Sequence, residues 1–396
     1  MLVTAERRVA HLAGPPPSRA QQHAGLRLGS LQVPSPVVLA PMAGVTNAAF
    51  RRLCREQGGG LYVCEMITSR GIVEGDRTSL AMLSFDETET TRSVQLYGID
   101  PVYVGKAVQI LCGDYGVHHV DLNFGCPVPK VTRKGGGAAL PWKTGLLSDI
   151  LSSAVRAAEP YGVPLTCKTR KGVDEDHLTY LDAGRIAEDA GCAAIALHGR
   201  TAAQHYSGQA DWDAIARLVD HVDIPVLGNG DIWEAADALA MVEQTGCSGV
   251  VVGRGCLGRP WLFRDLAAAF AGETIRTLPS LGEVATMMRR HTVLLAEHLG
   301  EQKGCVEFRK HVAWYLKGFR AGGPMRKRLA TISSIAELDE LVAQLDPDEP
   351  FPLGELGIPR GRQGSPKKVL VPDGWLESRR IEGAVDPAAE DPVSGG

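Results

Sequence analysis

Between residues 30 and 270 the sequence repeats one unit eight times: a short apolar run of strand type that ends in polar or glycine residues, followed by a stretch of helical character. The apolar runs are residues 37–40, 61–64, 93–96, 117–122, 165–169, 193–197, 224–227 and 249–252. The candidate helices between and after them include residues 48–56, 101–111, 145–159, 176–190, 212–221, 232–245 and 261–269. Nearly continuous apolar strands that alternate with helices are typical of a parallel sheet covered on both faces. Because open doubly wound sheets usually have fewer strands, eight units predict an α/β fold, a (β/α)8 TIM barrel over residues 30–277.

The segments on either side of the barrel differ from it in character. Residues 1–29 contain three consecutive prolines and no apolar core of the signal-peptide kind, so we expect a flexible extension. Strand-like runs stop at residue 278, and residues 278–346 predict a small all-α domain with helices over residues 283–299, 306–318 and 335–345. Residues 347–396 are rich in proline and glycine and predict a mostly disordered tail that could gain order on a partner.

Charge is distributed unevenly along the chain. The 42 basic and 46 acidic residues give a formal net charge of -4, which excludes a globally basic nucleic-acid coat. Residues 286–334 nevertheless hold ten basic and three acidic residues, a local balance of ten minus three, or +7 before histidines. The basic residues are Arg289, Arg290, Lys303, Arg309, Lys310, Lys317, Arg320, Arg326, Lys327 and Arg328. The predicted helical domain is therefore a basic module on an acidic protein.

The cysteines argue against a disulfide or zinc framework. Their number is nine, and no pair has C-x-x-C spacing. A reducing cytoplasm is the simplest context for such a chain. No group of residues has metal-ligand spacing and no apolar stretch reaches about 18 residues, so we expect no metal and no membrane span. We also expect a monomer.

Polar or conformationally special residues stand at the carboxyl end of almost every predicted strand, which is where TIM barrels place their chemistry. They are Pro41, Met42 and Ala43; Glu65; Gln95; Asn123 and Cys126; Lys168 and Arg170; His198; Asn229, Gly230 and Asp231; and Gly253 and Arg254. A purely structural barrel would not need a polar group at nearly every rim position.

The last two turns predict a phosphate site. Glycine-rich loops that open onto helix N-termini present backbone N–H groups to an anion, and Arg254 adds a planar cation. The alternative is that these glycines only permit tight turns. Gly253, Gly255 and Gly258 also fit a dinucleotide fingerprint, but they close the eighth unit instead of opening a first one, so we set that interpretation aside.

Cys126 is the sharpest candidate for chemistry. It lies in a Gly-Cys-Pro turn after a strand, and an ordinary thiol is mostly protonated near neutral pH, so it could donate a proton. The alternative, a small buried hydrophobe, is the one we adopt for Cys64, Cys167, Cys192 and Cys247. Lys168 is a charge in an apolar strand, which either meets an anionic cofactor atom or reaches to the barrel rim. His198 could equally be a core histidine.

Several motifs together resemble the tRNA-dihydrouridine synthases, most closely the bacterial type with Val-Pro-Lys after Cys-Pro. They are APMAGVTN (residues 40–47), VQLYG (94–98), DLNFGCPVPK (121–130), LHGRT (197–201), DW (211–212), GNGD (228–231), GR (253–254) and RKHVAWYLKG (309–318). The resemblance runs from about residue 36 to residue 345. It departs from the family pattern at Ala202, where we expect a basic residue, and at Arg259, where we expect asparagine.

The resemblance implies an FMN-bound barrel that uses NADPH to reduce the C5=C6 bond of specific uridines in tRNA. Pro41, Met42 and Ala43 would lie against the flavin, Gln95 and Lys168 would hydrogen-bond its ring, and His198 would contact it. Asn229, Gly230, Asp231, Gly253 and Arg254 would cradle the FMN phosphate. Cys126 would donate the proton to C5, with Asn123 and Arg170 positioning the uracil. The basic helical domain, through Arg309, Lys310, Arg326, Lys327 and Arg328, would hold the tRNA backbone.

Two other functions remain open from sequence. One is an FMN barrel oxidoreductase that acts on free pyrimidines, of the dihydroorotate or dihydropyrimidine type. The basic helical domain argues against it, because a free base needs no phosphate grip. The other is a non-catalytic RNA-binding protein on a barrel scaffold, which would purify without bound flavin.

Overall fold

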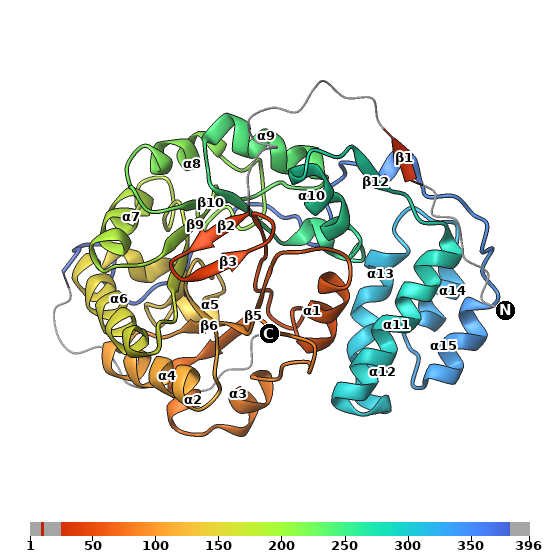
Figure 1. Ribbon diagram of the computed structural model, residues 1–396, viewed down its shortest axis with the longest axis horizontal. Coiled ribbons are helices and arrows are strands. Elements are labelled where there is room, and N and C mark those ends of the chain that lie inside the picture. Colours follow the sequence, from red (N-terminus) through yellow and green to blue (C-terminus); the bar gives the residue numbers. More distant parts are fainter. Residues whose placement is uncertain (1–8, 12–24, 381–396) are drawn as a thin grey trace.

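Eight parallel strands close into a barrel in the computed structural model, which describes residues 9–11 and 25–380 (Figure 1). In spatial order they are β4 (Val37–Leu39), β5 (Leu61–Thr68), β6 (Ser93–Tyr97), β7 (His119–Phe124), β8 (Leu165–Arg170), β9 (Ala194–His198), β10 (Val226–Asn229) and β11 (Gly249–Val252). The barrel closes where Val250 of β11 pairs in parallel with Val37 of β4. The predicted (β/α)8 TIM barrel is therefore confirmed.

The helices between the strands surround the barrel. They are α1 (Ala48–Arg55), α2 (Ser69–Val73), α3 (Arg77–Met82), α4 (Pro101–Gly113), α5 (Pro129–Thr132), η2 (Gly137–Trp142), α6 (Thr144–Ala158), η3 (Glu159–Tyr161), α7 (Tyr180–Asp189), α8 (Trp212–Val219), α9 (Ala235–Thr245), η4 (Arg254–Cys256) and α10 (Leu262–Phe270). Local sequence sets several starts: Asn47, Asp100 and Asp211 each accept a hydrogen bond from a backbone N–H of the first turn that follows. These caps fix where each loop of the barrel rim ends.

A hairpin closes the amino-terminal end of the barrel. Strands β2 (Leu26–Leu28) and β3 (Leu31–Val33) pair antiparallel, and Leu26, Leu28 and Val33 pack with side chains of the barrel interior. The expectation of a flexible extension through residue 29 is thus wrong for residues 25–29, because alternating apolar residues bury one face of the hairpin. Strand β1 (Val9–His11) also pairs, with β12 (Ile275–Thr277). Residues 1–8 and 12–24 lie outside the described residues.

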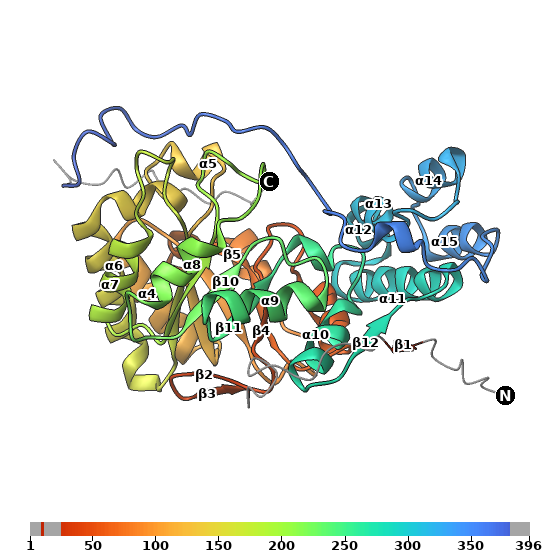
Figure 2. The same cartoon turned by 90° about the horizontal axis from the view of Figure 1, so that it is seen from above.

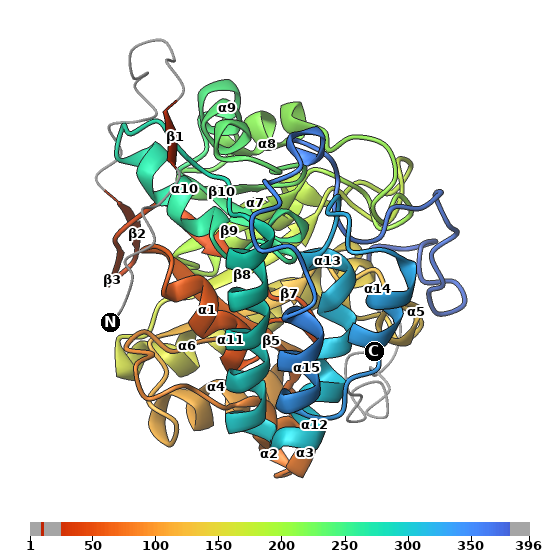
Figure 3. The ribbon, with the colours of Figure 1, turned by 90° about the vertical axis from the view of Figure 1, so that its right-hand side faces the viewer.

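The segment after the barrel is helical, as its sequence predicts. It contains α11 (Leu281–Leu299), α12 (Glu301–Phe308), η5 (Arg309–His311), α13 (Val312–Tyr315), α14 (Gly323–Leu329) and α15 (Ile335–Val342). A capping box between Ser280 and Glu283 starts α11. Its core also includes Leu53 and Trp261 from the barrel, and Figure 3 shows α11 alongside α1. The two parts therefore share apolar side chains, which fixes the helices beside the barrel.

The chain after residue 346 differs from the disordered tail that its composition predicts. After η6 (Leu353–Glu355) it crosses the barrel in an extended course as far as residue 380 (Figure 2). The buried Arg360 guanidinium donates to the Trp314 carbonyl at 2.8 Å, and the Trp375 indole donates to the Ala139 carbonyl at 2.9 Å. The segment is held by such polar contacts, which composition does not reveal. Residues 381–396 lie outside the described residues.

Gly258 lies where the barrel approaches the helical domain closely, so substituting this glycine tests that contact. Gly258 has φ +66°, and a Cβ there would lie 2.3 Å from the Trp314 carbonyl carbon of α13. Gly116 has a similar φ of +56° but no atom within 4 Å of that Cβ position. Alanine at either site carries the left-handed penalty of about 1–2 kcal/mol, and Gly258→Ala adds a backbone clash. We expect Gly258→Ala to lower the melting temperature clearly more than Gly116→Ala; equal losses would contradict the close approach.

Candidate active site

A chain of buried side-chain hydrogen bonds runs through the barrel interior toward its carboxyl-terminal mouth. The Ser93 hydroxyl contacts His119 Nδ1 at 2.7 Å, and His119 Nε2 contacts the Thr166 hydroxyl at 2.9 Å. Thr166 Oγ1 donates to Asp121 Oδ1 at 2.6 Å. Gln95 Nε2 donates to Asp121 Oδ2 at 2.7 Å. The five residues come from neighbouring strands β6, β7 and β8, whose register sets them opposite one another.

The direction of each proton in this chain follows from its acceptors. Because the Thr166 hydroxyl donates to Asp121, it accepts from His119 Nε2, and Ser93 must then donate to Nδ1. Burial lowers the pKa of His119 to about 4, so the ring is neutral and fits this pattern. Each hydrogen bond from Ser93 to Gln95 thus has a definite donor and a definite acceptor, and none of them requires a charged imidazole.

The chain ends at Asn123, whose amide holds the turn of Cys126. Asn123 Nδ2 donates to Gln95 Oε1 at 2.8 Å, and its Oδ1 accepts from the Gly125 and Cys126 backbone N–H groups at 3.0 and 2.9 Å. These bonds also orient the Gln95 amide, which keeps one N–H beyond its bond to Asp121. Asn123, expected to position a substrate, is thus engaged within the protein through both heavy atoms of its amide.

Cys126 is the one partly exposed cysteine; the other eight, all within residues 25–380, are buried. It packs against Met66, Tyr97 and Val131. Gly137 closes over the turn: at φ +54°, a Cβ there would lie 2.5 Å from the Cys126 carbonyl oxygen. Burial raises the pKa of the Cys126 thiol, although nearby Arg170 and Lys168 charges oppose the rise. The sulfur therefore keeps its proton near neutral pH.

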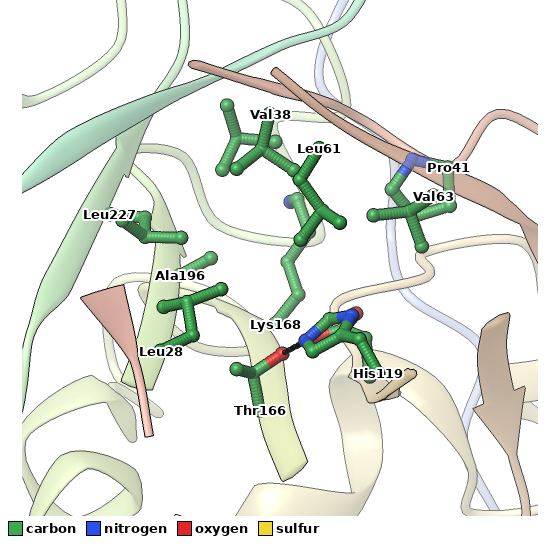
Figure 4. Close-up of a pocket in the computed structure, with 12 residues that line it drawn as sticks. Leu28, Val38, Pro41, Leu61, Val63, His119, Thr166, Lys168, Ala196 and Leu227 are labelled. Carbon is green, nitrogen blue, oxygen red and sulfur yellow. Dashed lines mark hydrogen bonds between the residues drawn. The ribbon is translucent and has the colours of Figure 1, made fainter. Parts of the chain in front are cut away.

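Lys168 lies on β8 between Asn123 of β7 and Ala196 of β9. It lines a mostly apolar cavity inside the barrel, together with Pro41, Leu61 and other side chains (Figure 4). Its ammonium group makes no hydrogen bond to any residue within the described ranges. Burial, with the Arg170 charge, lowers the pKa of Lys168 to about 7. It is therefore a poorly compensated cation, which the field of Asp121 only partly offsets.

Arg170 ties the Cys126 turn to the loop after β9. Its Nε donates to the Gly125 carbonyl at 2.9 Å, and Nη1 donates to the Thr201 and His205 carbonyls at 3.0 and 2.9 Å. Burial lowers its pKa to about 10, still far enough above neutrality to keep the charge. Its Nη2 has no hydrogen-bond partner in the described part of the chain, so one end of the guanidinium is available to a ligand.

The Asp231 carboxylate binds one arginine side chain and lies close to a second. Its carboxylate accepts two bonds from Arg200 Nη2, at 2.7 and 2.8 Å, and one from the Ala210 N–H at 2.7 Å. Arg254 Nη2 lies 3.7 Å from the same carboxylate. A carboxylate repels a phosphate, so the contacts of Asp231 are with arginines that an anion would favour and not with an anion itself. The sequence places Arg200 at the end of the sixth predicted strand, inside the LHGRT motif, but indicates no role for this residue.

The glycine corner after β10 and β11 is tight. Gly230 has φ +127°, and a Cβ there would lie 2.6 Å from Ala210 Cβ and 3.1 Å from His198 Cδ2. Asn229 Nδ2 donates to the Val251 carbonyl at 2.7 Å and so ties β10 to β11. Burial lowers the pKa of His198 well below its ordinary value, which makes it a neutral ring.

The first and last strands meet at Gly253 and Met42. A Cβ on Gly253 would lie 3.8 Å from Met42 Sδ, an ordinary contact distance. Arg254 lies over the rings of Tyr206 and Trp233, with its guanidinium carbon 4.2 and 5.0 Å from their centroids. Pro41 lines the cavity, and Ala43 is exposed at the rim. The predicted cofactor residues therefore come together around the carboxyl ends of the strands.

The basic residues of the helical domain differ in their exposure and in the groups that they contact. Lys310 lies near the rim loop after β4, where a Cβ on Gly44 would be 3.6 Å from its Nζ, and it forms an ion pair with Glu307. Arg309 and Arg326 donate to carbonyls within the domain, at Ile332 and at Leu316 and Phe319. Lys327 and Arg328 are exposed on α14.

Residues 9–11 and 25–380 contain neither a metal-binding cluster nor a helix suited to a membrane. No cluster there of three or more His, Cys, Asp or Glu side chains could hold a metal ion. No helix in the same ranges has the length and apolar character that crossing a membrane requires.

Comparison with known proteins places the chain among relatives. Residues 38–347 match the family model described as Dihydrouridine synthase (Dus). A Mycobacterium tuberculosis H37Rv protein named "Probable tRNA-dihydrouridine synthase" is 56% identical over 364 residues, covering 90% of this chain and 93% of that protein. The tRNA-dihydrouridine synthase B of Pseudomonas aeruginosa is 40% identical over 292 residues, covering 74% and 86%. That of Pasteurella multocida is 36% identical over 312 residues, covering 79% and 93%.

The depressed pKa of Lys168 predicts a pH dependence of stability. Between about pH 7 and pH 10 the unfolded chain binds a proton at Lys168 that the folded protein does not, so the Lys168 contribution to stability rises with pH. Lys168→Met should therefore raise the free energy of unfolding most near pH 7 and less toward pH 10. Urea denaturation across this range, with the exposed Lys106→Met as control, measures the difference. A Lys168→Met effect that does not change with pH would contradict the buried cation.

Proposed function

The chain belongs to the dihydrouridine synthase family, and on this premise we propose that it is a tRNA-dihydrouridine synthase that uses FMN and NADPH to reduce the C5=C6 bond of uridines in tRNA. The observation that carries the proposal is the partly exposed thiol of Cys126, fixed at the mouth of the barrel near Lys168 and Arg170. Burial raises the pKa of this thiol and so favours its protonated form. A proton donor beside cations suits a reaction in which negative charge develops and is then quenched.

The residues around the mouth fit FMN. Lys168 is half-buried and has no hydrogen-bond partner among the described residues, and Gln95 keeps one unused N–H, so both can serve the polar edge of a flavin ring. A Cβ on Gly253 would meet no atom closer than 3.5 Å, so the backbone there is open where Arg254 supplies positive charge, which suits a phosphate. When bound, FMN reduced by NADPH supplies a hydride to C6 of the uracil.

Cys126 supplies the proton. Hydride addition at C6 leaves an electron pair shared between C5 and the C4 carbonyl of the uracil. The Cys126 S–H bond breaks as the C5–H bond forms, and the resulting thiolate regains its proton from water. Asn123 positions this thiol by fixing the Gly125 and Cys126 N–H groups, and Arg170 holds the same turn through the Gly125 carbonyl. Both are positioning residues in this scheme, and the free Nη2 of Arg170 can also contact the uracil.

The cation-rich rim contributes binding and charge. Lys168 would stabilise negative charge on the flavin ring, because a cation in a mostly apolar cavity is screened weakly. The Arg200–Asp231 ion pair keeps Arg254 and the glycine corner in place for the phosphate. His198, neutral and buried, would contact the flavin as an uncharged ring.

The helical domain supports a macromolecular substrate. Lys310 brings a positive charge to the rim loop after β4, and Lys327 and Arg328 are exposed on α14. Arg309 and Arg326 contribute differently, since each donates to carbonyls inside the domain and so holds the surface that presents the other cations. A uridine of folded tRNA must leave its stack to reach the mouth, which phosphate contacts on this domain would support.

Removing the thiol tests the function. Cys126→Ala should lower dihydrouridine formation in tRNA about 10²–10⁴-fold, the usual contribution of a positioned acid, because no other group donates to C5. Flavin absorbance and NADPH oxidation without tRNA should persist. The product is measured by chromatography of tRNA nucleosides. Cys112→Ala, which removes a buried thiol of α4, is the matched control.

Two results would contradict the proposal. Unchanged turnover in Cys126→Ala would remove the thiol from the chemistry. A wild-type protein that reduces free uracil and leaves unmodified tRNA untouched would replace tRNA as the substrate.

A further inference from the structure

An extended segment crosses the face of the barrel that carries the candidate site. Residues 357–380, called here the strap, lie beyond the residues that match the family model. In Figure 2 the strap runs along the opposite end of the barrel from the β2–β3 hairpin, and thus on the side of the strand carboxyl ends. It contacts the loops that follow β7, β8, β9, β10 and β11, and near its start it also contacts Trp314 and Lys317 of the helical domain.

The near end of the strap is fixed beside the phosphate corner. The Gly357 N–H donates to Glu234 at 3.0 Å, and the buried Arg360 guanidinium donates to the Trp314 carbonyl. Arg254 Nη1 then donates to the Arg362 carbonyl at 2.8 Å. The cation proposed to meet the cofactor phosphate thus also holds the strap.

The middle of the strap follows the loop after β9. The Lys367 N–H donates to the Ala203 carbonyl at 2.8 Å. Ala203 directly follows the LHGRT motif and the Ala202 position, where the family resemblance leads us to expect a basic residue. Lys367 therefore brings a positive charge to a rim loop that lacks the expected one.

The far end of the strap is anchored on the segment after the Cys126 turn. The Trp375 ring covers Gly135, where a Cβ would lie 2.4 Å from the indole, and its Nε1 donates to the Ala139 carbonyl. Lys143 Nζ donates to the Ser378 carbonyl at 2.6 Å. The neighbouring Ala138 N–H donates to the Cys126 carbonyl at 3.0 Å, so this anchor and the thiol share one short segment.

The anchors leave the strap's cations exposed. The strap contains six basic and two acidic residues, a balance of six minus two, or +4, in a chain whose net charge is -4. Arg362, Lys367 and Lys368 are exposed, and none of their side chains forms a hydrogen bond or ion pair with a residue of the described ranges. The strap is held instead through backbone groups and through the side chains of Arg360, Trp375 and Arg379, the last of which forms an ion pair with Asp182. Cations concentrated on a fixed edge without acidic partners are typical of a surface that binds phosphates.

We propose that the strap is a second RNA-binding surface, through which Arg362, Lys367 and Lys368 contact backbone phosphates of the tRNA. This inference rests on the proposed function. Lys310 of the helical domain lies near Gly44 in the loop after β4 and near Glu65 of β5, whereas Arg362 and Lys367 of the strap lie beside the loops after β11 and β9. The mouth therefore opens between two basic surfaces, and an RNA that crosses it is held on both sides of the entering uridine.

Removing the three charges from the full-length protein tests this inference. Arg362→Gln, Lys367→Gln and Lys368→Gln combined should weaken binding of an unmodified tRNA transcript about tenfold and make the slope of log affinity against log salt shallower by about two to three, because each lost phosphate contact removes about 0.7–0.9. Fluorescence anisotropy over a salt series gives both values. The matched control combines Arg77→Gln, Lys106→Gln and Arg156→Gln, three exposed cations on α3, α4 and α6.

Each other outcome overturns the strap surface. Unchanged affinity and salt slope would show that the tRNA phosphates are bound elsewhere on the protein. An equal loss of affinity in the control variant would show that only the net charge of the protein matters. Tighter binding would show that the strap competes with the RNA. These outcomes test the strap when the wild-type protein forms dihydrouridine in tRNA. A wild-type protein that forms none would instead refute the proposed function.

Discussion

The side-chain amide of Asn123 is the link on which the candidate site depends. On one side it closes a hydrogen-bond chain that begins at Ser93 in the barrel interior, and on the other it holds the N–H groups of Gly125 and Cys126. The Asn123 amide also donates to Met66 Sδ at 3.2 Å, so it donates twice and accepts twice, which leaves its turn little freedom. The rigid barrel therefore sets the position of the Cys126 thiol, although the thiol itself lies on a loop.

The mouth of the barrel carries more positively charged side chains than negatively charged ones. Lys168, Arg170, Arg200 and Arg254 place four cations near it, while Asp121 and Asp231 are committed to hydrogen bonds that orient neighbours. This excess of positive charge raises the energy of the empty site and favours an anionic ligand. Further exposed cations lie on the helical domain, at Lys327 and Arg328, and on the strap, at Arg362, Lys367 and Lys368.

Much of this could be predicted from the sequence, for definite reasons. The strand-helix period predicted the barrel, the motif DLNFGCPVPK placed Cys126 in the turn after a strand, and the apolar run around Lys168 placed that residue within a strand. The role of Arg200 escaped because it depends on Asp231, which is distant in sequence and adjacent only once β9 and β10 pair. The strap escaped because its anchors are mostly backbone carbonyls and N–H groups, which have no compositional signal. Arg309 and Arg326 were read as surface charges for the same reason: their acceptors are carbonyls.

The central claim is that Cys126 carries its proton at the pH at which the protein works. The most direct measurement is the rate at which iodoacetamide alkylates Cys126, followed by mass spectrometry of its peptide as the pH is raised. Because burial raises the pKa of this thiol, the account predicts slow alkylation at neutral pH and a rate that still climbs above the range of an ordinary thiol. A rate already at its plateau near neutral pH would show a thiolate there and contradict the account.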